Sequence, residues 1–337
     1  MKLDFEHRQS AHCESGVTSS LLRKTSGNKI TEPLAFGIGA GLFFCYIPLI
    51  KINNGPAIAF RTFPGLIFKR TCNALGIPVT RKKFSSKEKA EGFLQQCLAE
   101  GKPVGCQVGV YYLSYFPREY RFHFNAHNLI VFGKEDDNYL ISDPVMENPT
   151  TLTSYELERV RFAKGALAPK GQIYYPAGDA EITDEQIRKA IISGIKRNVN
   201  QMLRIPGSFA GIRGVKNTGI KIKKWRDKLG LQKAGSYLAQ LVRMQEEIGT
   251  GGGGFRYIYA AFLQEAHAYV KNDELLEISK IFTQAGDLWR TAAVQAAGIY
   301  KGRLGSQADF DQMGDYLIEI AAVEKNAFLA LKNIKWQ

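Results

Sequence analysis

The chain has 337 residues, a formal net charge of +13, and 45% hydrophobic and 23% charged residues. This apolar content is sufficient for packed cores and excludes an intrinsically disordered chain, and the length favours two domains of ordinary size. The amino-terminal end has no apolar stretch behind its charges, and no run of about 18 apolar residues occurs, so we expect neither a secretory signal nor a membrane span.

The cysteines form no CxxC pair, and their number is odd, which argues against a disulfide framework and against a thiolate zinc site. They are Cys13, Cys45, Cys72, Cys97 and Cys106. Unpaired thiols are typical of a reducing compartment. We therefore expect a cytoplasmic protein without a bound metal.

The first predicted helix begins near Cys13. Glu14 suits a helix start, and Val17, Leu21 and Leu22 fall on one face at helical spacing. Unpaired N–H groups and the positive end of the helix dipole lower the pKa of a thiol at this position and favour the nucleophilic thiolate. Cys13 is therefore the candidate nucleophile, and the alternative is a buried structural cysteine.

A glycine-rich apolar segment follows at 34–44, with Gly37, Gly39 and Gly41 alternating with apolar residues. The spacing does not fit a dinucleotide-binding loop. These glycines are expected to let backbones approach closely or to leave room for a ligand beside the thiol. Glu32, just before them, either contacts an amine substrate or belongs to a helix start.

The next part of the chain mixes helices with strands and is rich in aromatic residues. We expect helices at 64–75 and 85–100 and strands at 78–83 and 103–113. Tyr111 opens a cluster of aromatic side chains that continues to Phe124. Such a cluster can line an apolar channel for an acyl or pantetheine group, although core packing also accounts for it.

Two β-rich runs at 125–133 and 138–144 are separated by a polar turn and predict a hairpin. His127 opens the first strand and Asp143 closes the second, so both side chains are expected at one edge of the sheet. A carboxylate that binds Nδ1 of the imidazole would leave Nε2 facing the thiol, as a general base requires. His123 is the rival base, and His127 is preferred because it starts the hairpin.

This order of residues resembles a known family. The papain-like fold, especially in bacteriocin-processing cysteine peptidases, has a cysteine on an amino-terminal helix, then a histidine at a strand start, then an Asp-Pro pair. The sequence is more similar still to the amino-terminal domain of the butirosin biosynthesis acyltransferase family, through His12-Cys13, the segment 31–44, His127 and Asp143-Pro144. The resemblance covers nearly the whole chain.

The resemblance implies an acyltransferase that takes an acyl group from the phosphopantetheine thioester of a carrier protein, holds it on Cys13 and passes it to an amine. No cofactor beyond that arm is implied. The processing peptidases place a glutamine further upstream of their cysteine, whereas the nearest one here is Gln9. Backbone N–H groups near Cys13 are therefore expected to hold the oxyanion, with Gln9 and His12 at the substrate site.

From residue 183 the pattern becomes helical. Helices are expected at 184–203, 220–229, 236–248, 255–271, 273–300 and 309–334. The predicted fold class is α+β, with a papain-like catalytic domain at 1–178 and an all-α domain at 179–337 that serves as substrate or carrier-protein platform. The loop 249–254 leads into a helix near Arg256, a position that either holds a pantetheine phosphate or is a plain connector.

The positive charge is concentrated between residues 188 and 228, which contain twelve Lys or Arg residues and only Asp227 as an acid. Such a surface favours an acidic partner, and an acidic carrier protein fits better than nucleic acid because no nucleic-acid-binding signature occurs. A solvated surface and a non-enzymatic binding module remain alternatives. A cysteine amidase or peptidase with the same three residues is the alternative enzyme.

Overall fold

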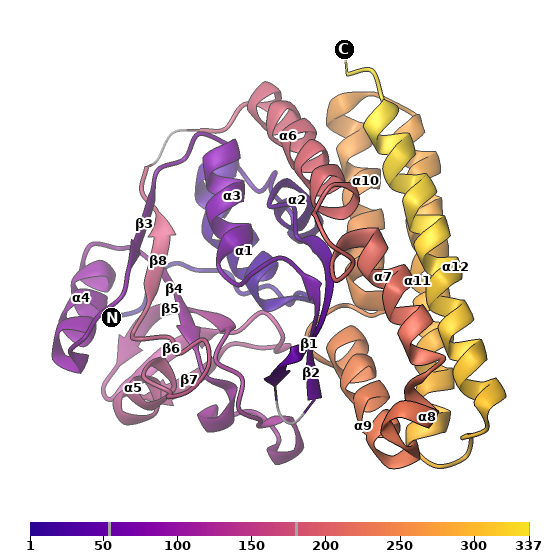
Figure 1. Ribbon diagram of the computed structural model, residues 1–337. Helices are drawn as coiled ribbons and strands as arrows, with labels where there is room; N and C mark the ends of the chain where they lie inside the picture. The colour runs from indigo at the N-terminus through magenta and orange to yellow at the C-terminus, as the bar shows by residue number, and fades with distance from the viewer. Residues whose placement is uncertain (53–54, 179–180, 337) are drawn as a thin grey trace. The chain divides into compact units, whose positions relative to one another are not determined.

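The computed structural model describes residues 1–52, 55–178 and 181–336. Contacts between residues divide the chain into two compact units. Figure 1 labels the helices and strands of both units. The first unit contains Met1–Ala35 and Ile67–Gln186, and the second contains Phe36–Leu66 and Ile187–Gln337. The protein is a mixed α/β protein, with a sheet in its amino-terminal part and helices in its carboxy-terminal part. This confirms the coarse part of the predicted fold class.

The first unit is built on a six-stranded antiparallel sheet with strand order β3-β8-β4-β5-β6-β7. The strands are β3 Val79–Lys82, β4 Val104–Val108, β5 His127–Glu135, β6 Asn138–Ser142, β7 Thr150–Thr153 and β8 Ile173–Pro176. The predicted hairpin is β5–β6, which pairs Glu135 with Asn138 at the turn and Ile130 with Ser142 at the far end. This register brings the start of β5 and the end of β6 to one edge of the sheet.

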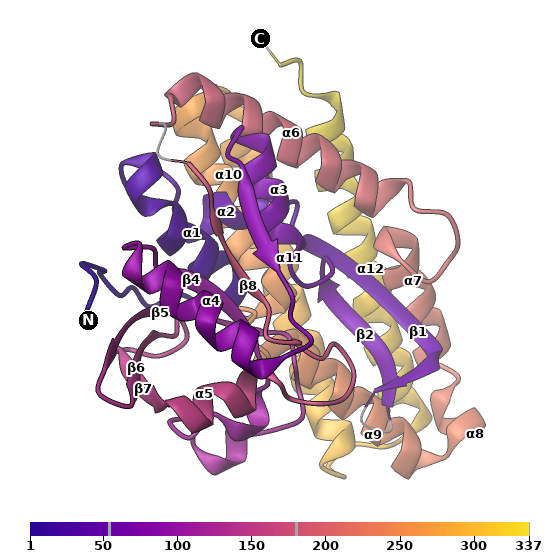
Figure 2. The ribbon, with the colours of Figure 1, turned by 90° about the vertical axis from the view of Figure 1, so that its left-hand side faces the viewer.

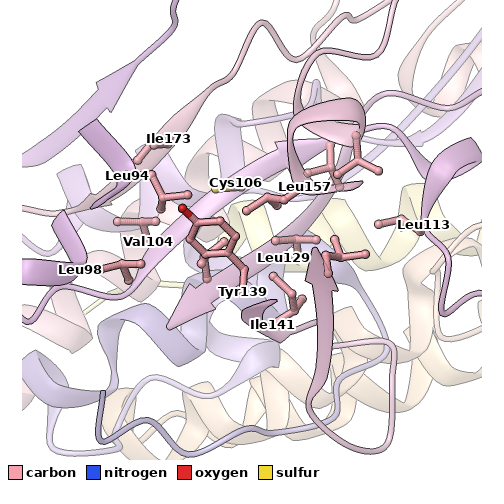
Figure 3. Packing of buried hydrophobic residues seen from close by; sticks show 14 of the residues in the cluster. Leu94, Leu98, Val104, Cys106, Leu113, Leu129, Tyr139, Ile141, Leu157 and Ile173 are labelled. Carbon is pink, nitrogen blue, oxygen red and sulfur yellow. The ribbon is translucent and has the colours of Figure 1, made fainter. Parts of the chain in front are cut away.

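Four helices of this unit pack against the sheet, α3 Leu66–Ala74 through its Phe68 ring on Tyr174 of β8. The others are α1 Cys13–Ser26, α4 Lys87–Ala99 and α5 Ser154–Arg161, and α2 Glu32–Ile38 runs from the first unit into the second. The core beneath α4 and α5 joins Leu94, Leu98 and Leu157 to strand residues such as Cys106 and Leu129 (Figure 3). Burying these side chains removes apolar surface from water, which is the main favourable term in folding.

The second unit consists of helices and one hairpin. The helices are α6 Asp184–Leu203, α7 Gly211–Ile222, α8 Trp225–Leu229, α9 Leu231–Val242, α10 Arg256–Val270, α11 Glu274–Tyr300 and α12 Gln307–Asn333. α6, α10, α11 and α12 agree with the predicted helices to within two residues. The predicted helix at 220–229 is instead the end of α7 followed by α8, and the predicted helix at 236–248 is α9 continued by a π-helical turn at Arg243–Glu247.

The hairpin of the second unit, β1 Leu42–Ile52 and β2 Gly55–Arg61, was not predicted. It forms a two-stranded sheet that packs on helices of its own unit, β1 on α7 and β2 on α9 (Figure 2). Polar groups from the helical part complete its hydrogen bonding, since the Asn198 amide donates to the Leu42 carbonyl and Tyr46 N donates to the Phe209 carbonyl. The contacts therefore group 36–66 with the helices, whereas the sequence predicted one uninterrupted domain over 1–178.

None of the helices in the described residues is both long enough and apolar enough to cross a membrane.

Candidate active site

Helix α1 places Cys13 at its first residue. His12 is the N-cap: its backbone is extended, and its Nδ1 accepts a hydrogen bond of 3.3 Å from Ser15 N. This cap satisfies one of the N–H groups that a helix start leaves unpaired. The buried Cys13 thiol therefore lies at the positive end of a 14-residue helix, as predicted.

Glu32 fixes the segment that precedes Cys13. Its carboxylate accepts hydrogen bonds from Ala11 N at 2.9 Å, from His12 N at 2.7 Å and from the Ser15 hydroxyl at 3.2 Å. Burial raises the pKa of Glu32, and the two backbone hydrogen bonds partly oppose this. These contacts make Glu32 a positioning residue for the entry into α1, while the amine contact predicted for it stays a prediction.

Close packing brings α1 to the edge of the sheet where Asp143 lies. A Cβ at Gly16 would come within 2.7 Å of Pro144 and 2.6 Å of Ser10, so only glycine fits there without displacement. Ser10 N also donates to the Pro144 carbonyl at 2.6 Å. The start of α1 and the residues after β6 are thereby joined.

His127 and Asp143 meet at this edge. Nε2 of His127 lies 2.6 Å from Oδ2 of Asp143, and both side chains are buried. The imidazole also forms a side-chain hydrogen bond with Cys13, for which Nδ1 is the ring nitrogen that remains. The sequence predicted the three residues together but with the ring nitrogens exchanged. Residue order does not determine the imidazole rotamer, so it could not decide between the two nitrogens.

The charge state of His127 follows from its neighbours. Burial by itself would lower its pKa, but the charges of Asp143 and Cys13, together with hydrogen bonds to both, raise the pKa to about 10. The ring therefore carries a proton at neutral pH. A cation beside the sulfur favours the thiolate form of Cys13.

The other cysteines have the opposite environment. Burial raises the pKa of Cys72 to about 12 and that of Cys106 to about 11, and it also raises the pKa values of Cys45 and Cys97. Thiols of this kind are mostly protonated at neutral pH and react slowly. Cys13 thus differs from the other four cysteines in having the charged His127 ring as a partner.

Two residues of the aromatic cluster that the sequence places before His127 contact the His127–Asp143 pair. The Tyr115 hydroxyl donates to Oδ2 of Asp143 at 2.7 Å, and the Phe116 ring packs edge-on against the His127 ring with centroids 5.6 Å apart. Burial and the Asp143 charge raise the pKa of Tyr115 well above its usual value, so it stays a neutral donor. The density of aromatic residues before His127 was visible in the sequence, but the ring that reaches Asp143 was not.

Asn128 is a further residue that sequence reasoning missed. Its Nδ2 lies 3.8 Å from the Cys13 sulfur and 3.1 Å from the Ala126 carbonyl, and its Oδ1 accepts a 2.7 Å hydrogen bond from the Tyr174 hydroxyl. Because a carbonyl can only accept, the contact with Ala126 fixes the nitrogen on the side of Cys13. The only signal in the sequence was the position of Asn128 directly after His127.

Several predicted site residues of the first unit lie outside this group. Gln9 is exposed on the segment before His12. Tyr111 is 43% exposed and stacks on His123, with ring centroids 4.1 Å apart. The rival base His123 is exposed beside Tyr111, whereas His127 contacts both Asp143 and Cys13.

The glycines predicted to leave room for a ligand have packing roles in the second unit. A Cβ at Gly37 would lie 2.1 Å from the Phe262 ring, and one at Gly41 would lie 2.5 Å from the Phe36 ring. Gly39 lies in the turn that follows α2. The space that Gly37 and Gly41 provide is therefore filled by aromatic side chains, which corrects the expectation of a ligand there.

Arg256 also differs from its predicted role. Its side chain is fully buried and donates to both carboxylate oxygens of Glu324, at 2.8 and 3.0 Å, and to the Gly254 carbonyl at 2.7 Å. In the preceding loop, Gly253 N donates to the Glu246 carboxylate at 3.0 Å. Carboxylates of the chain itself thus occupy the donors that the sequence suggested for a phosphate.

Within the described residues, no group of three or more His, Cys, Asp or Glu side chains is arranged to hold a metal ion.

Two family models match the chain. The one described as "Butirosin biosynthesis protein H, N-terminal" matches residues 12–144, and the one described as "Domain of unknown function (DUF4872)" matches residues 155–331. No curated protein matches the chain. The first match begins at the N-cap of α1 and ends one residue after Asp143, so it spans all three residues of the buried Cys-His-Asp group.

Proposed function

Because this chain belongs to the DUF4872 family and its first part resembles the amino-terminal domain of butirosin biosynthesis protein H, we propose that it is a cysteine-dependent acyltransferase of specialised-metabolite biosynthesis. One observation carries the proposal. His127 forms hydrogen bonds with both Cys13 and Asp143, and Cys13 begins a helix. A nucleophile, a base and an orienting carboxylate in contact are what covalent acyl transfer requires.

In the first step, the Cys13 thiolate attacks the carbonyl carbon of a thioester. The carbon–sulfur bond of the donor breaks, and the imidazolium of His127 gives its proton to the departing thiolate. The oxyanion would be stabilised by backbone N–H groups at the start of α1 and by Nδ2 of Asn128, which lies 3.8 Å from the Cys13 sulfur. One such donor contributes about 3 kcal/mol to transition-state stabilisation in well-studied enzymes.

In the second step, an amine attacks the acyl-cysteine. Neutral His127 accepts the proton of the amine, an amide forms, and Cys13 leaves as a thiolate paired with the imidazolium. Asp143 holds Nε2 throughout and so directs Nδ1 at the sulfur. The raised pKa of His127 keeps this proton on the ring for the next cycle.

The proposal includes a papain-like fold for the first unit. Its support is the combination of a cysteine at the start of a helix with a histidine at the first residue of an antiparallel strand. The proposed donor is the phosphopantetheine thioester of a carrier protein. An acidic carrier would suit the exposed basic residues of α6 and α7, which include Lys196, Arg197, Arg213 and Lys216.

The proposal is tested by intact-mass measurement after incubation with acyl-pantetheine thioesters. We expect a mass increase on Cys13 that an added amine removes, with no adduct in Cys13→Ala. Cys45→Ala is the matched control, because it deletes a thiol with a raised pKa and should retain the adduct. Discharge by water at the same rate with and without amine would identify a hydrolase, and an adduct that persists in Cys13→Ala would refute the proposed nucleophile.

A further inference from the structure

A cavity of about 550 Å³ in the first unit is lined by side chains that the mechanism does not use. We call it the arginine pocket, and its lining residues are Tyr111, Tyr112, Ser114, Arg118, Arg121, Glu156 and Arg159. Three guanidinium groups and one carboxylate give it a formal charge of +2 (three positive charges less one negative). A pocket of this size accommodates a ligand considerably larger than a lone inorganic ion.

Two of the arginines are held by neighbouring groups. The Arg159 guanidinium lies over the Tyr112 ring, 3.8 Å from its centroid. Arg121 donates Nε to the Phe116 carbonyl at 2.7 Å and Nη2 to the Ser114 carbonyl. A guanidinium has five N–H donors in a planar fork, so these contacts orient the group and leave donors for a ligand.

The single carboxylate of the pocket is already engaged. Glu156 closes the capping box of α5, where it accepts hydrogen bonds from Thr153 N at 2.9 Å and from the Thr153 hydroxyl at 3.0 Å. Its side chain also bonds Ser114. The carboxylate therefore serves the helix start, and the arginines remain available to a ligand anion.

This combination fits a phosphate ester. A guanidinium group can donate two parallel hydrogen bonds to two oxygens of one phosphate. Aromatic side chains such as Tyr111 and Tyr112 can cover the apolar organic part of the ligand. Five of the seven lining residues belong to the segment 111–121. The same segment supplies Tyr115, which bonds Asp143, and Phe116, which packs on His127. A ligand in the pocket would thus be held by the loop that also contacts the reacting group.

We propose that the arginine pocket binds the phosphate of a phosphorylated pantetheine donor, which directs the thioester end of that arm to Cys13. This inference rests on the proposed function, which names the donor class but assigns no residues to its phosphate. The phosphate could come from an arm esterified to a carrier-protein serine or from free coenzyme A. Both sources share the phosphorylated pantetheine.

The test compares acyl-pantetheine with acyl-phosphopantetheine as donors. The readout is the ratio of the two Cys13 acylation rates in the wild-type protein, in Arg118→Gln and in Arg118→Gln/Arg159→Gln. Because a charge-assisted hydrogen bond corresponds to about a tenfold effect or more, the wild-type protein should prefer the phosphorylated donor by about 10- to 100-fold. Arg118→Gln should reduce this ratio, and the double variant should reduce it by about tenfold or more. Lys102→Gln removes an exposed positive charge outside the pocket and should keep the ratio.

Binding of the unacylated compounds, measured by calorimetry, separates this inference from the proposed function. If no donor acylates Cys13 but phosphopantetheine binds about tenfold more weakly to the double variant than to Lys102→Gln, the proposed reaction fails and the pocket assignment stands. Equal binding of phosphopantetheine and pantetheine to the wild-type protein, or a phosphate preference that survives in the double variant, would overturn the pocket assignment. Stronger binding of a phosphopantetheinyl-serine peptide than of coenzyme A would identify the protein-borne arm.

Discussion

The Tyr115 hydroxyl and Oδ2 of Asp143 lie 2.7 Å apart, so the oxygen that contacts Nε2 of His127 also accepts a second hydrogen bond. Two donors on one oxygen fix the carboxylate, and the carboxylate fixes the imidazole. We therefore expect Tyr115→Phe to lower the rate of Cys13 acylation about tenfold, because a hydrogen bond to a charged group contributes about 1.5–3 kcal/mol. Mass spectrometry of reactions quenched at successive times measures this rate.

Tyr120→Phe is the control for this substitution, since Tyr120 is exposed in the same segment. Cys13 of this variant should be acylated at the wild-type rate. An unchanged rate in Tyr115→Phe would show that the hydrogen bond does not position Asp143.

The Asn128 side chain gives a second prediction. If Nδ2 stabilises the oxyanion, Asn128→Ala should lower kcat by about 100- to 1,000-fold with little change in KM, because the interaction strengthens only as negative charge develops. Tyr174→Phe should have a smaller effect in the same direction, since Nδ2 keeps its contact with the Ala126 carbonyl. Steady-state kinetics with one thioester donor separates kcat from KM.

Asn73→Ala removes an exposed amide and should leave both constants unchanged. A rise in KM with constant kcat in Asn128→Ala would assign Asn128 to ground-state binding instead.

The pH dependence of thiol reactivity follows from the raised pKa of His127. A raised value means that the ring keeps its proton until the pH approaches about 10, so the positive charge beside the sulfur is present from pH 6 to 9. The alkylation rate of Cys13 by iodoacetamide should therefore vary little between pH 6 and 8 in the wild-type protein. In His127→Gln the rate should rise with pH toward about 8.5, the ordinary thiol value.

Cys13→Ala supplies the background from the other cysteines, which is subtracted at each pH. A steep rise between pH 6 and 8 in the wild-type protein would contradict the thiolate–imidazolium pair.

The parts of the site that the sequence predicted depend on local patterns. Two β-rich apolar runs on either side of a polar turn predicted β5 and β6, and the register of that hairpin brings the start of β5, with His127, and the end of β6, next to Asp143, to one edge of the sheet. The start of α1 at Cys13 was equally local. Asn128 was not predictable. Side chains alternate between the two faces of a strand, so Asn128 is expected on the face opposite His127. Because β5 begins at His127, this alternation does not yet decide where the Asn128 side chain lies.

In the second unit, too, part of the structure could not be predicted from local sequence patterns. Pro48 and Pro56 argue against strands at the sequence level, yet β1 contains Pro48 within a register shift between Ile47 and Lys51. The partner of Arg256 could not be read from the sequence either, because Glu324 lies 68 residues away and is brought close only by the packing of the helices.

This buried ion pair supports the last prediction. Arg256 and Glu324 are both fully buried, and the Trp289 indole also donates to the carboxylate at 2.8 Å. Arg256→Met should therefore reduce the free energy of unfolding by about 3–5 kcal/mol, because it leaves a buried carboxylate without its cation. Arg256→Met/Glu324→Leu should recover most of this loss, since neither charge remains. Urea denaturation of the three proteins measures the difference, and a single variant as stable as the wild-type protein would show that the arginine is not needed to neutralise Glu324.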